Sequence, residues 1–216
     1  VKTFNSNAES RMEENAESDP PLRPCQEACL RACADGARVV EMACGTGKTR
    51  VMRELVKNIS GKVLISVPSR VLLEQFGEVF PSFCKVGTSY NANINHSANG
   101  FISVSRSVNL LGKIKFAGVF VDEAHHPDPV GLPACKETYR FSATHEKEAE
   151  FKYGMGQAIE DGTLCDYDLT VPMVSRDEHP YIALARLLVS QSGKFRRVLA
   201  YCNTVPEAKR IQRMLE

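Results

Sequence analysis

From residue 22 onward, the sequence predicts an α/β fold built on a parallel sheet. Short apolar runs alternate with helical patterns, which is the arrangement of βαβ units. Several of these runs are hydrophobic nearly throughout, as expected for strands that are covered on both faces. One run leads through the glycine-rich residues 43–49 into a helical pattern, and this strand–loop–helix order is typical of nucleotide-binding folds.

The individual elements follow from this alternation. Strands are expected at residues 38–42, 62–67, 101–104, 117–121 and 139–142. Helical patterns follow at residues 48–59, 70–80, 106–111 and 146–151. Further along, residues 166–175 are expected to be extended, with helices at 180–192 and 206–215 and a strand at 197–202 between them.

Three segments are expected from changes in composition. Residues 1–21 are polar and acidic and cannot bury enough apolar surface to fold, so they are predicted to be disordered, with a short helix at residues 9–17 as the alternative. Residues 22–172 form the main domain. Residues 173–216 are the start of a second domain, and the helical pattern that runs to the last residue suggests a cut end.

Composition excludes several classes of protein. The 216 residues carry a net charge of +1, so any polyanion must bind to a local patch rather than through bulk charge. Because no run of 18 apolar residues occurs, no membrane span is expected. The eight cysteines contain no C-x-x-C pair, which favours reduced thiols in an intracellular protein of the nucleus or cytoplasm.

Three of the cysteines, at positions 25, 29 and 33, are spaced to form one stripe of a helix. A metal or redox site is one interpretation. Packing of small hydrophobic side chains is the other, and we favour it because no fourth ligand lies nearby in the sequence.

A phosphate-binding loop is the strongest functional signal. Gly45 and Gly47 allow a tight turn that directs backbone N–H groups toward a phosphate, and Thr46 lies between them. Lys48 is predicted to reach the β- and γ-phosphates of a nucleotide, and the hydroxyl of Thr49 to bind Mg²⁺. The pattern is partial, because Met42 stands where the complete motif has its first glycine.

An acidic pair follows the predicted strand at 117–121. Ligand sites of open α/β sheets lie at the carboxyl ends of strands, where this pair falls. Asp122 is expected to hold Mg²⁺ and Glu123 to orient and deprotonate the attacking water. His125 is in a position to link this site to a neighbouring element by hydrogen bonds.

Together these motifs resemble a superfamily 2 helicase of the DEAD/DEAH-box type, nearest to the branch of type I restriction motors and XPB-like helicases. The resemblance rests on the phosphate loop, on DEAH at 122–125 and on SAT at 142–144, and extends over about residues 22–205. It implies a RecA-like P-loop NTPase domain followed by an incomplete second RecA-like lobe, with ATP and Mg²⁺ as cofactors.

The resemblance also assigns further residues. Gln26, in an L-R-P-x-Q segment, would contact adenine, although a surface glutamine is the alternative. Ser142 and Thr144 would couple the γ-phosphate to the nucleic-acid face, with an ST-turn as the alternative. Contacts with nucleic-acid phosphates would come from Ser69, Arg70 and Ser105. For Ser69 and Arg70, a plain helix cap and a solvated arginine are the alternatives.

The predicted function is therefore an ATP-dependent helicase or translocase acting on the phosphate backbone of DNA or RNA, with DNA slightly favoured. The sequence contains no Q-x-x-G-R-x-x-R string, in which the second lobe of such motors carries its arginine fingers. Weak ATP binding and very slow hydrolysis by this chain alone are therefore expected. A nucleotide-gated nucleic-acid-binding module without turnover remains the alternative, and a duplex-tracking translocase without unwinding is another.

Overall fold

The computed structural model of the chain describes residues 19–145, 148–169, 171, 173–175, 178–194 and 199–216. The chain divides into two compact units, one ending at Asp166 and the other beginning at Tyr167. Most of the segment predicted to be disordered, and the alternative helix within it, lie outside the described residues. The domain boundary expected after residue 172 remains a prediction.

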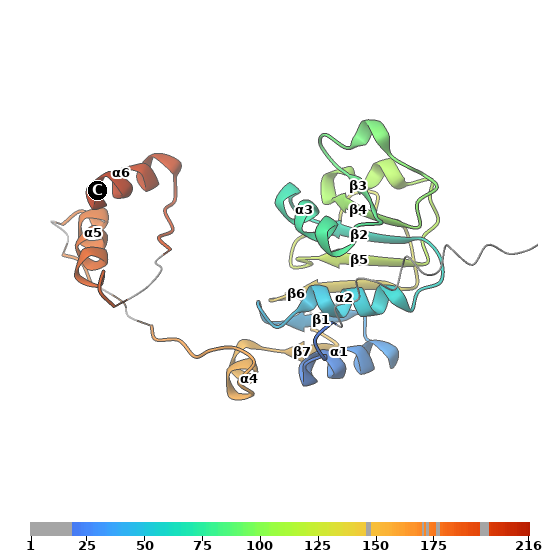
Figure 1. Cartoon of the computed structure of the whole chain (residues 1–216), viewed down its shortest axis with the longest axis horizontal. Coiled ribbons are helices and arrows are strands. Elements are labelled where there is room, and N and C mark those ends of the chain that lie inside the picture. Colours follow the sequence, from blue (N-terminus) through green and yellow to red (C-terminus); the bar gives the residue numbers. More distant parts are fainter. Residues whose placement is uncertain (1–18, 146–147, 170, 172, 176–177, 195–198) are drawn as a thin grey trace, which may run out of the picture. The chain divides into compact units, whose positions relative to one another are not determined.

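Seven parallel strands form the sheet of the first unit in the described residues, in the order β3-β4-β2-β5-β6-β1-β7 (Figure 1). The α/β fold with a parallel sheet is thus confirmed. The strands are β1 (Val39–Met42), β2 (Val63–Val67), β3 (Cys84–Val86), β4 (Gly100–Val104), β5 (Gly118–Asp122), β6 (Thr138–Ser142) and β7 (Phe151–Tyr153).

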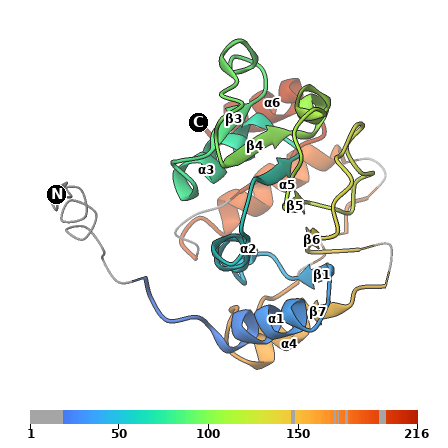
Figure 2. The ribbon, with the colours of Figure 1, turned by 90° about the vertical axis from the view of Figure 1, so that its right-hand side faces the viewer.

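The helices of the first unit are α1 (Pro24–Ala34), α2 (Lys48–Lys57), α3 (Arg70–Val79) and α4 (Met155–Glu160), with the 3₁₀ turns η1 (Asn91–Asn93) and η2 (Ser105–Leu111). Helices α1 to α3 pack on one face of the sheet, where they bury the larger hydrophobic cluster. On the other face, η2 and neighbouring loops cover a second cluster around Phe101 (Figure 2). Strand β2 is buried along its whole length, as its apolar sequence predicted.

The cysteine stripe of α1 lies in the larger cluster. Cys25, Cys29 and Cys33 are all buried there, so the packing interpretation is confirmed. Among the described residues, no group of three or more histidine, cysteine or acidic side chains is arranged to hold a metal ion.

Of the two remaining helical predictions in the first unit, one is wrong. The helix expected at 146–151 does not form in its described part, because Phe151–Tyr153 makes strand β7 beside β1 instead. Its buried Tyr153 follows an exposed Lys152, an alternation of period two that the preceding charged residues obscured. The helical pattern at 106–111 is confirmed, and the helix that it forms there is the 3₁₀ helix η2.

The second unit contains α5 (Pro180–Ser190) and α6 (Val205–Leu215), close to the predicted helices. Residues 199–202 are not in a strand, and the rest of the strand expected at 197–202 lies outside the described residues. The described residues between 166 and 175 have no regular secondary structure. None of the described helices is long and apolar enough to cross a membrane.

Candidate active site

The loop between β1 and α2 has the backbone geometry that its glycines predicted. Gly45 and Gly47 have φ angles of +81° and +94°, a region in which side chains other than glycine are strained. Gly47 is the N-cap of α2, so Lys48 and Thr49 open the helix. The first N–H groups of a helix have no partner within it, and its dipole favours an anion at that point. A phosphate therefore fits this loop.

Two side chains bond to backbone carbonyls at or just before the start of the loop. The buried hydroxyl of Thr46 donates to the carbonyl of Ala43 at 2.7 Å, which closes the turn. The ammonium group of Lys48 donates to the carbonyl of Met42, the last residue of β1, at 3.1 Å. The lysine therefore lies back along the loop, as a residue that reaches bound phosphates must.

Two residues at the start of helix α1, Arg23 and Gln26, bond to the backbone of the loop. The guanidinium group of Arg23 donates to the carbonyl of Gly45 at 3.1 Å. The amide nitrogen of Gln26 donates to the carbonyl of Thr46 at 3.1 Å. The amide oxygen of Gln26 accepts a bond from the backbone N–H of Arg23 at 3.0 Å. Gln26 is buried and supports the phosphate loop, so the surface-glutamine alternative is wrong. Its predicted adenine contact remains a prediction.

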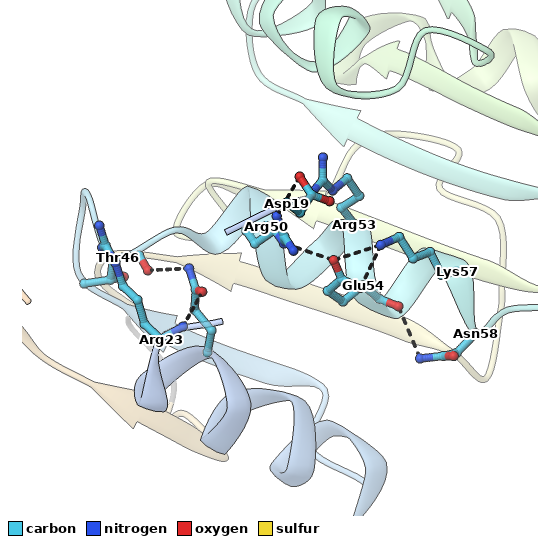
Figure 3. A network of polar contacts seen from close by, with 9 residues as sticks. Asp19, Arg23, Thr46, Arg50, Arg53, Glu54, Lys57 and Asn58 are labelled. Atoms are coloured by element: carbon cyan, nitrogen blue, oxygen red, sulfur yellow. Dashed lines mark hydrogen bonds and ion pairs between the residues drawn. The ribbon is translucent and has the colours of Figure 1, made fainter. Parts of the chain in front are cut away.

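An ion-pair network continues along α2 (Figure 3). Asp19, which precedes α1, pairs with both Arg50 and Arg53, while Arg50 also lies 2.9 Å from Glu54. The hydrogen bond from Arg53 is the main reason why the pKa of Asp19 lies below its usual value. Sequence reasoning missed this network. Only the spacing of Arg50 and Glu54, one helical turn apart, could have indicated part of it.

The acidic pair lies at the carboxyl end of β5. Asp122 is the last residue of the strand and is buried. Burial, followed by the charge of Glu123, raises the pKa of Asp122 to about 6, while the charge of Lys48 opposes the rise. Glu123 has a φ angle of +52°, which is unusual for a residue other than glycine. Strained backbone of this kind is concentrated at functional sites.

His125 links this pair to β6. Nδ1 of His125 lies 3.3 Å from the carboxylate of Glu123 and 2.9 Å from the hydroxyl of Ser142. That hydroxyl donates its proton to the carbonyl of Thr144 at 2.6 Å, so Nδ1 of His125 is the donor toward Ser142. The backbone N–H of Thr144 bonds back to the Ser142 hydroxyl at 3.2 Å. The local turn and the link to the DEAH segment therefore both exist.

Two of the predicted ligands carry oxygen atoms that suit a divalent cation. A hydroxyl from Thr49 and a carboxylate from Asp122 are oxygen donors, and Mg²⁺ in nucleotide sites uses one or two such protein ligands together with phosphate and water. The charge of Lys48 acts on the pKa of Asp122, so the phosphate loop and the acidic pair lie close enough to interact. Both follow parallel strands, whose carboxyl ends meet at one edge of the sheet. The donor set is therefore consistent with a magnesium–nucleotide complex.

The predicted nucleic-acid contacts lie at the ends of β2 and β4. Ser69 is the N-cap of α3 and accepts a bond from the backbone of Leu72 at 3.3 Å, while Arg70 is exposed at the start of the same helix. The hydroxyl of Ser105 donates to the carbonyl of Val67 at 3.1 Å. The two serine hydroxyls thus have structural roles, and Arg70 is the side chain directed to solvent.

Comparisons with known proteins place these motifs in context. Residues 19–129 match the family model ResIII, described as type III restriction enzyme, res subunit. No curated protein sequence matches the chain significantly. Two solved structures share 16% identity with it, the SWI2/SNF2 ATPase core of Sulfolobus solfataricus in complex with dsDNA and the Hef helicase domain of Pyrococcus furiosus.

The structural matches are partial. The first covers 57% of this chain and 32% of the other, with a TM-score of 0.45. The second covers 67% of this chain and 37% of the other, with a TM-score of 0.47. This chain thus spans about a third of each matched chain.

Proposed function

This chain belongs to the ResIII family (type III restriction enzyme, res subunit), of the superfamily 2 helicase type, and from that premise we propose that it binds Mg²⁺–ATP in a RecA-like domain and couples the nucleotide to a nucleic acid. The observation that carries the proposal is the position of His125, whose Nδ1 lies near the carboxylate of Glu123 and hydrogen-bonds to Ser142. A simple ATP-binding domain has no need for this link between its acidic pair and a second strand.

Each side chain has a role in this proposal. The phosphate loop from Gly45 to Thr49 binds the phosphates, and Lys48 neutralises their charge. Thr49 and Asp122 hold Mg²⁺, which supplies positive charge against the phosphate oxygens when it is bound. Glu123 orients the attacking water and accepts its proton.

The nucleic acid would bind through its phosphate backbone. Arg70, at the exposed start of α3, is the side chain best placed for such a contact among those predicted. DNA is the partner that we propose to test first, with RNA as the alternative. Because phosphate contacts carry little sequence information, binding should depend strongly on salt and weakly on sequence.

A nucleotide-gated binding module without turnover is the second candidate. The observation that favours it is the lack of a Q-x-x-G-R-x-x-R string in the 216 residues. Arginine fingers contribute about 10³–10⁵ to the rate in related NTPases, so hydrolysis by this chain alone should be very slow.

Hydrolysis assays separate the two candidates. Phosphate release from ATP is measured with and without oligo(dT), oligo(U), duplex DNA and duplex RNA, and the Glu123→Gln variant is the control. A motor domain shows slow hydrolysis that one polymer raises and that Glu123→Gln abolishes. ATP binding without any release, in the presence of every polymer, supports the gated module instead. A chain that does not bind ATP contradicts both.

A further inference from the structure

His145 directly follows the predicted coupling segment and bonds to the strand that leads into the phosphate loop. Its ring atom Nε2 lies 3.0 Å from the carbonyl oxygen of Val40 in β1, and its backbone N–H donates to the carboxylate of Glu41 at 3.3 Å. Because a carbonyl oxygen can only accept, Nε2 must carry the proton. Glu41 is itself held in place by an ion pair of 3.0 Å with Lys152 of β7.

The segment from Ser142 to His145 is therefore fixed at both ends. At its start, Ser142 bonds to His125, which follows the acidic pair. At its end, His145 bonds to β1 only a few residues before the loop that begins at Ala43. The two contacts attach one short segment to the DEAH segment and to the strand that leads into the phosphate loop.

Open space and several polar side chains border this end of the segment. A cavity of about 290 Å³ lies beside it, lined largely by polar side chains that include His125, His126 and His145. Arg140, which also lines the cavity, uses its guanidinium group in an ion pair of 2.7 Å with Asp128. At this cavity, the hydrogen bonds of His145 hold the end of the segment to β1.

We propose that His145 is a positioning residue that attaches the coupling segment to β1, so that a change in the phosphate loop is transmitted to Ser142 and Thr144. A two-state coupling device needs both of its contacts to respond to the same ligand. The His125 contact reports the state of the acidic pair, and the His145 contact reports that of the phosphate loop. This inference rests on the proposed ATP-binding function.

The test measures backbone hydrogen exchange across residues 142–145 of the full chain, with and without saturating Mg²⁺–ATPγS. Three variants are compared with the wild type. His145→Ala removes the ring contact. His145→Gln restores a side-chain N–H donor for Val40. His126→Ala is the matched control, because His126 lines the same cavity and is exposed.

We expect nucleotide binding to slow exchange in this segment of the wild type by about fivefold or more, in the range of ordinary coupling energies. In His145→Ala the response should disappear, although the variant still binds the nucleotide. His145→Gln should recover much of the response, and His126→Ala should keep it. If His145→Ala proves unfolded by circular dichroism, the Gln variant decides, since a folded Gln variant must recover much of the response.

Two results overturn the inference alone. One is a wild-type response in a His145→Ala variant that binds nucleotide. The other is a folded, nucleotide-binding His145→Gln variant without a response. A wild-type chain that does not bind Mg²⁺–ATPγS removes the proposed function, and the inference falls with it. The two failures are therefore distinguishable, because binding is measured separately from exchange.

Discussion

The burial of Asp122 lowers the stability of the folded protein at neutral pH. Its carboxyl group is buried beside Glu123, and its pKa is raised to about 6. Between the ordinary carboxyl pKa and this value, the folded state binds more protons than the unfolded state. The contribution of Asp122 to stability is therefore greatest at low pH and is lost as the pH rises through about 6.

The Asp122→Asn variant should consequently be more stable than the wild type near neutral pH. Two pKa units correspond to about 3 kcal/mol, so we expect a gain on the order of 1–3 kcal/mol in the free energy of unfolding. The gain should vanish at about pH 4, where Asp122 is protonated in both states. Urea unfolding across this pH range measures it, and equal stability of the two proteins at every pH would contradict the account. The variant should also lose Mg²⁺-dependent ATP binding.

Gly47 is a second residue whose role can be isolated. A β-carbon added there would lie 2.2 Å from the side-chain nitrogen of Gln26, in addition to the strain of a φ angle of +94°. Gly36 is a matched control, since its φ angle is +114° but no atom lies within 4 Å of the added carbon.

We expect Gly47→Ala to lower the free energy of unfolding by more than Gly36→Ala. The control should cost about 1–3 kcal/mol for backbone strain alone. Gly47→Ala adds the displacement of Gln26 from the carbonyl of Thr46, and it should also weaken ATP binding, which Gly36→Ala should not. Equal costs in urea unfolding would show that the contact between α1 and the loop has no energetic importance.

At the scale of elements, the sequence predicted the features that depend on residues close to one another in the chain. The succession of β1, the loop and α2 was predicted from the apolar pattern and from two glycines with positive φ angles. Both signals span only a few residues of sequence. Strand β7 was missed because it is short and forms only by pairing with β1, more than 100 residues earlier in the chain. The bond between His145 and Val40 joins equally distant positions and leaves no local signal.

For the candidate site as well, the sequence indicated some features and not others. The residues of the phosphate loop and the acidic pair follow from motifs that fix chemistry by spacing. Gln26 was predicted as a site residue, but its bond to the loop depends on how α1 packs against α2. The Asp19 network depends on the same packing. Contacts of this kind are decided by tertiary structure, so the sequence alone could not supply them.

Helix α1 provides a prediction at this scale. Because Cys29 is fully buried, Cys29→Ser should lower the free energy of unfolding by about 1–3 kcal/mol, the usual cost of a buried hydroxyl without a good partner. Adding EDTA should leave the melting temperature of the wild type unchanged, since the stripe packs in the core rather than holding a metal. A melting temperature that falls with EDTA and recovers with zinc would contradict this interpretation.

At the scale of the whole molecule, the proposed nucleotide site lies in one unit. The family match at 19–129 and every proposed ATP or Mg²⁺ ligand fall before Asp166, where the first unit ends. The sheet order places β6 between β5 and β1, so the acidic pair, the coupling segment and the phosphate loop follow three neighbouring strands. Parallel strands bring these carboxyl ends to one edge.

A chain that ends after Asp166 should therefore keep the nucleotide affinity of the 216-residue chain within about threefold, because no proposed ligand is removed. Its urea unfolding should remain cooperative. Fluorescent ATP-analogue titration and urea unfolding followed by circular dichroism make the comparison. A loss of affinity of about tenfold or more would show that the second unit contributes to the site.

The most direct test of the central claim is calorimetric titration of the chain with Mg²⁺–ATP, alongside Lys48→Ala and Glu123→Gln. We predict binding by the wild type and by Glu123→Gln, which keeps the phosphate loop and the Mg²⁺ ligands intact. We predict no detectable binding by Lys48→Ala, which removes the charge that meets the phosphates. Absence of binding by the wild type, or equal binding by Lys48→Ala, would contradict the assignment of this loop as the nucleotide site.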